Sequence, residues 1–464
     1  MYSIIKEKGV LLMKFVPVLD KKFNPMSVVL RDYRKEVLVS DKKRLNLCVE
    51  RNDGYNYIYS LDIFASSEKN EENYQLVERI IKSILWVVGG YKIYLDDEYL
   101  FNRIKADYTN SGRRAFDVDF METVYEKTFE VIYAVGEDFP QKNYSNVKIG
   151  GHLDGCRIGF DAGGSDRKVS AVIDGKVVYS EEVVWFPKTN SDYHYHYDGI
   201  LTAMKTAASK MPRVDAIGVS SAGVYINNKI MVASLFLKVP KEDYKPHVQN
   251  MYIDVAKEIG APIEVANDGD VTALAGAIDL KDNCVLGIAM GTSEAVGYIN
   301  EKGLLNGWLS EVAFVPVDFN EEAMVDEWSG DYGCGVKYFS QDGVIKLAEN
   351  AGYKFPDDSS PAEKLKIIQN LMNEGNDLAK QIYEDIGVYL GYAIPYYAEF
   401  YKIKHLLLLG RVTSGEGGSI IVNKAKEVLK AEFPEYADIN LSMPDEKNKR
   451  VGQSIAAASL PEIK

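Results

Sequence analysis

Two glycine- and hydroxyl-rich turns, each lying between two predicted strands, constrain the fold of this chain most strongly. The first belongs to the stretch GFDAGGSDRK at residues 159–168, and the second is GTS at residues 291–293. Glycine turns leave backbone N–H groups uncovered, and these groups can bind anionic oxygens. Taken alone, each turn is equally what an ordinary β-hairpin needs, so its meaning depends on the surrounding pattern.

From Cys156 onward, groups of strands lead into helices twice along the chain. Strand patterns over RIGFDAGG, KVSAVID and KVVYSEEVVW precede a helix over GILTAMKTAASKM, and the buried strands VDAIGVSS and IEVAND follow. The pattern recurs with NCVLGIAM, AVGYIN and HLLLLG, and with helices over DLAKQIYEDIGVYLGYAIPYYAEFYK and SIIVNKAKEVLKAEF. This repetition predicts an α/β fold of two similar lobes with a cleft between them. We assign the first lobe to residues 151–280 and the second to residues 281–464.

Residues 1–150 differ from the rest of the chain and predict a separate α+β domain whose role the sequence does not indicate. The runs MSVVL, EVLVS, LNLCVE and YIYSLDIF are rich in β-branched and aromatic residues and predict strands. The run NYQLVERIIKSILWVV has apolar residues at helical spacing. The basic residues of RDYRKEVLVSDKKR are expected on a solvated strand face. Residues 137–155 contain Pro, Asn and Gly and predict a linker.

Charge and cysteine usage exclude several classes of partner. The 464 residues carry a formal net charge of −14, which argues against non-specific binding of nucleic acid. No run of about 18 uncharged apolar residues occurs, so no membrane span is expected. The four cysteines are scattered and form no C-x-x-C pair, which is typical of a reducing compartment. We therefore expect a cytoplasmic protein.

Acidic, basic and hydroxyl side chains accompany these turns at positions suited to phosphate chemistry. Asp161 precedes the first glycine pair, where a carboxylate can hold Mg²⁺, and Lys168 adds positive charge. Ser165, Thr292 and Ser293 can donate from their hydroxyls. Asp268 follows a strand end and begins a helix, so it is either a helix cap or a base that faces the cleft.

The order of these motifs resembles the actin–hexokinase–Hsp70 superfamily and, within it, the ROK family of sugar kinases and regulators. The resemblance covers roughly residues 156–464. It rests on the two turns, on Asn267-Asp268, on Glu311 in SEVAFVPVD and on Gly333-Cys334. It implies a two-lobed actin-like ATPase (ribonuclease H-like) fold and an ATP-dependent carbohydrate kinase that acts on a small sugar-like substrate. A homodimer is a further expectation from the family.

The resemblance also implies roles for individual residues. Asp268 would be the catalytic base, Asn267 and Glu311 would bind the substrate, and Mg²⁺ would lie near Asp161 with ATP. The ATP-binding residues would be Asp161, Gly163, Gly164, Ser165, Lys168, Gly291, Thr292, Ser293 and, on the adenosine side, Gly410, Gly417 and Gly418.

Several family positions are replaced in this chain. Phe314 stands where the family has a zinc-binding and sugar-binding histidine, and only Cys334 remains of the zinc cysteines. We therefore expect no structural zinc. Leu235 and Val336 replace an asparagine and a glutamate that contact sugar, which predicts an altered substrate pose.

Two alternative interpretations stay open. The first is a non-catalytic sugar- or nucleotide-binding sensor or regulator, although the strand-rich N-terminal region does not predict a DNA-binding helix-turn-helix. The second concerns His194 and His196, which would share one face of a strand and bind a metal, or else lie in a surface loop.

Overall fold

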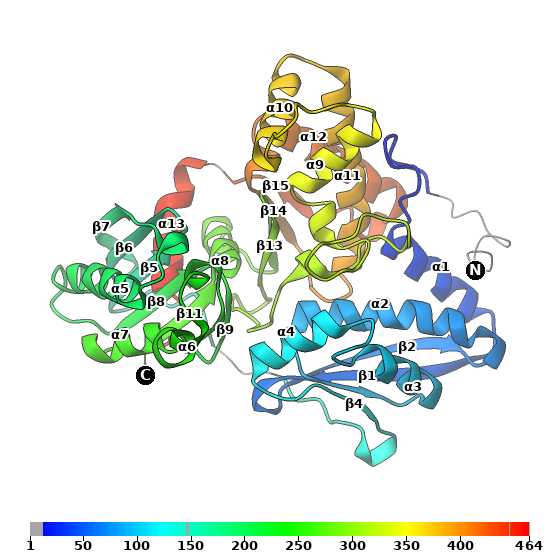
Figure 1. The fold of residues 1–464 in the computed structure, drawn as a ribbon, viewed down its shortest axis with the longest axis horizontal. Helices are drawn as coiled ribbons and strands as arrows, with labels where there is room; N and C mark the ends of the chain where they lie inside the picture. Colours follow the sequence, from blue (N-terminus) through cyan, green and yellow to red (C-terminus); the bar gives the residue numbers. More distant parts are fainter. Residues whose placement is uncertain (1–12, 145–147, 445, 464) are drawn as a thin grey trace.

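The computed structural model describes residues 13–144, 148–444 and 446–463, which build three larger sheets with helices packed around them (Figure 1). The N-terminal sheet has the order β2-β1-β3-β4. Its strands are β1 (Lys42–Glu50), β2 (Asn56–Phe64), β3 (Lys92–Leu95) and β4 (Glu130–Tyr133). Helices α1 (Met26–Leu38), α2 (Asn70–Val88), α3 (Glu98–Asp107) and α4 (Ala115–Tyr125) complete the predicted α+β domain.

One N-terminal prediction is wrong, because MSVVL and the start of EVLVS form α1 and not strands. Met26, Leu30, Tyr33 and Val37 recur at helical spacing and are buried. A run of five apolar residues is too short to distinguish a helix from a strand. The basic residues of this segment divide between two elements. Arg31 and Arg34 lie on α1 and pair with Glu432 and Glu399 of the second lobe, whereas Lys42, Lys43 and Arg44 lie on β1, where Lys42 and Arg44 are exposed as predicted.

The first lobe contains a five-stranded sheet of order β11-β8-β5-β6-β7. Strands β5 (Cys156–Ala162), β6 (Asp166–Ile173) and β7 (Lys176–Val184) are antiparallel neighbours. Strands β8 (Ala216–Ser221) and β11 (Ile263–Asn267) run parallel to β5. The carboxyl ends of β5, β8 and β11 therefore lie at one edge. The lobe also holds helices α5 (Tyr193–Ala208), α6 (Lys241–Asp243), α7 (Met251–Ile259) and α8 (Asp268–Leu280), and the hairpin β9 (Val224–Ile226)–β10 (Lys229–Val232).

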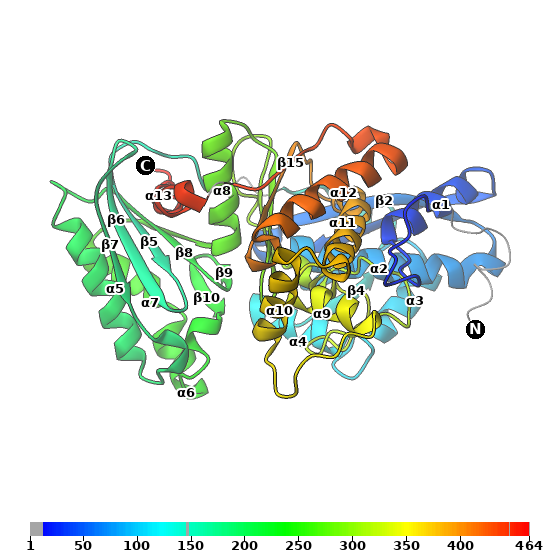
Figure 2. The same ribbon diagram turned by 90° about the horizontal axis from the view of Figure 1, so that it is seen from above.

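The second lobe contains a sheet of order β13-β12-β14-β15. Its strands are β12 (Val285–Met290), β13 (Glu294–Ile299), β14 (His405–Leu409) and β15 (Asn440–Ser442). The surrounding helices are α9 (Gln341–Asn350), α10 (Pro361–Asn373), α11 (Asp377–Tyr397) and α12 (Glu416–Glu432). The two predicted lobes are thus present, side by side in both views (Figures 1 and 2).

Helix α13 (Glu446–Ala458) crosses back from the second lobe and packs against β5, β8 and α8 of the first (Figures 1 and 2). Its backbone lies almost directly on the sheet. A Cβ at Gly218 would be 1.7 Å from the carbonyl oxygen of Ala457, and one at Gly159 would be 2.2 Å from that of Ser454. The domain ranges remain a prediction, but this part of 281–464 completes the layer that covers the first sheet.

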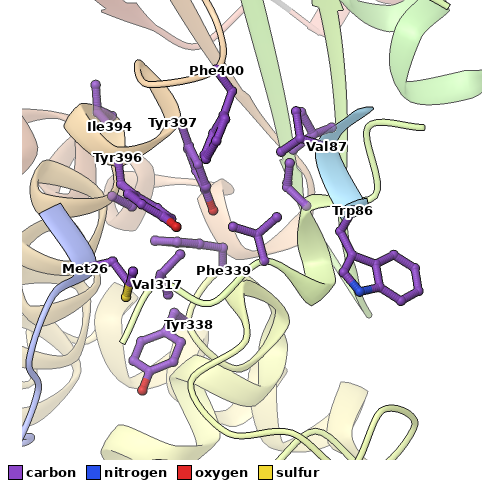
Figure 3. Close-up of a cluster of buried hydrophobic side chains, with 14 of the residues drawn as sticks. Met26, Trp86, Val87, Val317, Tyr338, Phe339, Ile394, Tyr396, Tyr397 and Phe400 are labelled. Atoms are coloured by element: carbon purple, nitrogen blue, oxygen red, sulfur yellow. The ribbon is translucent and has the colours of Figure 1, made fainter. Parts of the chain in front are cut away.

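The N-terminal domain and the second lobe share one hydrophobic core. Side chains of α1 and α2, such as Met26 and Trp86, belong to the same buried cluster as Phe339 and Tyr397 of the second lobe (Figure 3). Contacts with the first lobe are more limited: α4 packs against β9 and β10, and Lys245 pairs with Glu126 at 2.7 Å. Within the described residues, no helix is both long and apolar enough to cross a membrane.

Candidate functional site

Asp161 lies at the carboxyl end of β5, where neighbouring strands supply its partners. Ser220 of β8 donates to Asp161 Oδ1 at 2.9 Å. Lys168 Nζ of β6 lies 3.9 Å from Asp161 Oδ2 and 3.2 Å from Asp166 Oδ1. Burial raises the pKa of Asp161, and the Ser220 hydrogen bond and the Lys168 charge oppose that rise. The charge of Lys168 is therefore already shared by two carboxylates.

A second lysine, Lys188, lies over the first turn, and the sequence analysis missed it. A Cβ added to Gly164 would be 3.1 Å from Lys188 Nζ. Lys188 is exposed, and none of the ion pairs in the described part of the chain engages it. Strand pairing could have revealed its position, because the β6–β7 register sets Val184 opposite Asp166 and returns the chain to the turn.

Asn267 and Asp268 occupy the junction between β11 and α8. The helix cap is Asn267, whose Oδ1 accepts from the N–H of Gly269 at 2.8 Å and whose Nδ2 donates to the Gly223 carbonyl at 2.8 Å. Asp268 is the first residue of α8 and is open to solvent. The walls of the site partly desolvate Asp268 and raise its pKa; the Asp161 charge raises it further, and Lys188 lowers it. Asp268 is thus a solvent-accessible carboxylate whose pKa depends on the negative charge of Asp161 and the positive charge of Lys188.

Interacting carboxylates connect Asp268 to the second turn. Burial raises the pKa of Glu311 to about 7, and the charges of Asp268 and Asp270 add to the rise. Burial likewise raises the pKa of Asp270 to about 7 and that of Glu294, the residue after Ser293, to about 8. The Glu311 charge contributes to the Glu294 shift. Mutual charge effects on the pKa therefore link Asp161 and Asp268 to Glu311 and Glu294.

The second turn exposes its hydroxyl residues. The N–H of Gly291 donates to the Ser293 carbonyl at 2.9 Å, while Thr292 and Ser293 face solvent. Gly410, at φ 93°, lies beside this turn, because a Cβ there would be 2.3 Å from the Met290 carbonyl oxygen. Of the residues predicted on the adenosine side, Gly410 thus lies next to the second turn, which Gly291, Thr292 and Ser293 form.

Gly417 and Gly418 are placed differently from the other predicted nucleotide-binding residues. Both are buried in the first turn of α12. A Cβ at Gly417 would be 2.6 Å from the Tyr383 ring, and a Cβ at Gly418 would be 2.2 Å from the Thr413 carbonyl oxygen. Packing within the protein accounts for these two glycines, and their role toward adenosine stays a prediction.

The N-terminal domain holds the segment that carries Glu311. The backbone N–H groups of Leu309, Ser310 and Glu311 donate to the carbonyls of Val88, Val87 and Trp86 at 3.2, 2.9 and 2.9 Å. These carbonyls belong to the last turn of α2, where a helix has no partners of its own for them. The end of α2 therefore positions Glu311 through the backbone.

The three residues that replace family positions, Phe314, Val336 and Leu235, make apolar contacts within the protein. Phe314 packs on Trp86 of α2, with ring centroids 4.2 Å apart, and Val336 joins Ala313 and Cys334 in a small cluster. Leu235 lies in the core of the first lobe. The described residues include no group of three His, Cys, Asp or Glu side chains that could hold a metal ion.

A buried ionic cluster lies next to these apolar contacts. Asp331 accepts from Arg79 of α2 at 2.9 Å and from Lys82 of α2 at 2.5 Å, and it pairs with Arg114 at 2.9 Å. All four side chains are at most 4% exposed. The cluster ties the 331–334 segment to the N-terminal domain.

The histidine prediction is wrong in its geometry, because His194 and His196 lie in the first turn of α5 and not on a strand. His196 is buried, and its ring nitrogens lie 3.0 Å from the carbonyl oxygens of Asp192 and Pro187. His194 Nδ1 lies 3.0 Å from Asp192 Oδ1. The alternating aromatic residues of SDYHYHYDG resemble a strand pattern. The segment instead begins α5, which starts at Tyr193 after its cap, Asp192.

Comparisons with known proteins agree with this architecture. Residues 157–458 match the model of the ROK family. A ROK hexokinase from Thermus thermophilus has a TM-score of 0.51 at 14% identity, covering 65% of this chain and 97% of its own. A ROK family transcriptional regulator, a homologue of the E. coli MLC protein, has a TM-score of 0.51 at 17% identity, covering 66% and 79%.

A third solved structure, a ROK family glucokinase from Streptomyces griseus in complex with glucose and AMPPNP, has a TM-score of 0.47 at 18% identity and covers 65% and 98%. A search of curated protein sequences finds no match. Together with the family match, the likenesses confirm the predicted fold class.

Proposed function

The chain belongs to the ROK family, and from that premise we propose that it transfers a phosphoryl group from ATP to a hydroxyl of a sugar-like acceptor. The hexokinase likeness shows the fold alone, so the proposal rests on the site. The observation that carries it is the position of Asp268, an accessible carboxylate whose pKa responds both to Asp161 and to the unpaired Lys188.

The residues present fit a magnesium nucleotide. Lys188 has no carboxylate partner in the described residues and lies over Gly164, so an anionic phosphate there would neutralise it. The Gly163–Ser165 and Gly291–Ser293 turns would hold phosphate oxygens, and Asp161 would hold Mg²⁺. When bound, the ion supplies charge neutralisation for phosphoryl transfer.

Asp268 accepts the proton of the attacking hydroxyl in this proposal. Its raised pKa makes it a better base than an ordinary aspartate. Glu311 would present its two carboxyl oxygens to hydroxyl groups of the acceptor and so orient it. Asn267 contributes mainly by capping α8, because both ends of its amide already have partners.

The apolar character of Leu235, Phe314 and Val336 favours a second candidate, a sensor that binds nucleotide or sugar without turnover. These three side chains, at positions where the family offers a hydrogen bond to sugar, are here packed against protein. The retained Asp268 favours the kinase. The homodimer and the cytoplasmic location stay predictions.

The test is ADP release from MgATP with a panel of sugars and polyols, for the native protein and for Asp268→Asn. The kinase requires turnover with at least one acceptor and a loss of about 10²- to 10⁴-fold in the variant, whose ATP affinity, measured by calorimetry, is retained. ATP binding without turnover on any acceptor would establish the sensor instead.

A further inference from the structure

A pocket of about 430 Å³ lies where the N-terminal domain meets both lobes. Its walls come from the β1–β2 connection at residues 51–55, from the β9–β10 hairpin and from residues 305–309 of the second lobe. A volume of this size accommodates a small organic ligand. The N-terminal domain supplies one wall, so the pocket is not a feature of the two lobes alone.

The polar groups of this pocket include both donors and acceptors. Arg51 is 4% exposed, donates to the Gly307 carbonyl, and takes part in none of the ion pairs found in residues 13–144, 148–444 and 446–463. The acids Asp53, Glu264 and Asp270 also line the pocket, and burial raises the pKa of Glu264 and of Asp270 to about 7. The amide of Asn227 adds a donor and an acceptor at the exposed rim.

Hydroxyl groups match such a lining better than a purely anionic or cationic ligand does. Each hydroxyl can donate to a carboxylate and accept from a guanidinium or an amide. An anion would be repelled by the two acids as they ionise, and a cation would be repelled by Arg51. Four aromatic residues, Tyr55, Tyr125, Tyr225 and Trp308, add flat apolar surface to the same walls.

The pocket adjoins the candidate active site through α8 and the 309–311 segment. Asn267 lines the pocket and directly precedes Asp268, and Leu309 lines it two residues before Glu311. Asp270 lines it as well, and its charge raises the pKa of Glu311. The pocket therefore lies next to the elements that carry Asp268 and Glu311.

We propose that this pocket is a second sugar subsite, and that the acceptor is a disaccharide or larger glycoside whose non-reacting unit lies against the N-terminal domain. The inference deepens the proposed function and rests on it for the position of the reacting unit. A neighbouring pocket of about 420 Å³ shares Asn52, Asp53, Tyr125 and Asn227, which provides room for further units.

The test compares the binding of a monosaccharide with that of its disaccharides by calorimetry, in the presence of MgATP and the Asp268→Asn background. The probes are glucose against maltose and cellobiose, and N-acetylglucosamine against diacetylchitobiose. We expect at least one disaccharide to bind about 10-fold tighter than its monosaccharide, which corresponds to one or two added hydrogen bonds.

Two pocket variants and two matched controls identify the surface responsible. Asn227→Gly removes a rim side chain at a residue whose φ of 51° suits glycine, and Asp358→Gly does the same at φ 63° outside the pocket. Trp308→Phe trims the aromatic wall, and Trp328→Phe trims an exposed tryptophan elsewhere. The pocket variants should lower the disaccharide-to-monosaccharide affinity ratio about 3- to 10-fold, and the controls should leave it unchanged.

The outcomes separate this inference from the kinase proposal. Equal affinity for both members of every pair, or pocket variants that behave like their controls, overturns the subsite, even where the native protein phosphorylates monosaccharides. Disaccharide binding that depends on Asn227 and Trp308, together with no ADP release by the native protein, keeps the subsite and rejects the kinase.

Discussion

At the scale of single residues, the candidate site consists of carboxylates with raised pKa and one unpaired cation. Motifs at a strand end or a turn indicated Asp161 and Asp268, and the family resemblance indicated Glu311. Lys188 lies in no such motif, and only the pairing of β6 with β7 brings it close to Gly164. Likewise, the spacing of Gly417 and Gly418 could not show that Tyr383 and Thr413 fill the space beside them.

Replacing Lys188 should weaken both nucleotide use and the ionisation of Asp268. For Lys188→Ala we expect kcat/KM for MgATP to fall about 10- to 100-fold, the range for losing a charged hydrogen bond. Because the Lys188 charge lowers the pKa of Asp268, its removal should move the acidic limb of the pH–rate profile to higher pH. Steady-state kinetics from pH 5 to 9, with Lys176→Ala at the far hairpin turn as control, provide the measurement; an unmoved acidic limb would contradict the assignment.

Glu294 should make stability depend on pH. Burial raises its folded pKa to about 8 from an ordinary value of 4.5, and its Oε2 has no hydrogen-bond partner. The folded protein thus holds a proton that the unfolded chain releases, so stability falls as pH rises from about 4.5 to about 8. Glu294→Gln should therefore gain Tm relative to the native protein at pH 8.5 but not at pH 4.5. Thermal melts at the two pH values, with exposed Glu374→Gln as control, test this; a gain equal at both pH values would refute it.

At the scale of elements, the sequence predicted the strands and helices after Cys156 better than those before it. Buried strands such as VDAIGVSS and HLLLLG are continuous apolar runs between turn residues, and the structure has strands at both. In contrast, MSVVL became part of a helix because its burial against α11 is a tertiary property. For the same reason, no local pattern showed that the last carbonyls of α2 would bind the 309–311 backbone.

The link between α2 and the 331–334 segment should be essential to stability. Asp331 neutralises Arg79, Lys82 and Arg114 in a buried cluster, and only Glu78 would remain to do so in Asp331→Asn. Leaving buried charges without their partner costs about 3–5 kcal/mol, and we expect that loss in the free energy of unfolding. Urea titration against the exposed Asp358→Asn measures it, and a loss of less than about 1 kcal/mol would show that the cluster is dispensable.

At the scale of the whole molecule, the N-terminal domain is built into the two-lobed body and does not stand apart from it. It shares a core with the second lobe, positions Glu311 through α2 and closes one wall of the pocket beside α8. Phe314 packed on Trp86 and the ionic cluster around Asp331 add to this contact. The predicted linker after residue 136 therefore separates two stretches of sequence but not two independent bodies.

A shared core predicts shared unfolding. Amide hydrogens in the buried parts of α2 and α11 should exchange with the same opening free energy, because neither helix can lose its partner without exposing the other's apolar face. Native-state hydrogen exchange measured by mass spectrometry at increasing denaturant would test this. Exchange of α2 at markedly lower denaturant than α11 would show that the N-terminal domain opens by itself.

The return of α13 to the first lobe has a consequence for biosynthesis. Strands β5 and β8 are made early, yet the helix that covers their glycines at residues 159 and 218 is made after the entire second lobe. The last strand of that sheet, β11, ends roughly 180 residues before α13 begins. During translation, the apolar face of the sheet therefore stays exposed while these residues are added at about 5–20 residues per second. A nascent chain halted before residue 446 would therefore be a natural client for chaperones that bind exposed apolar strands.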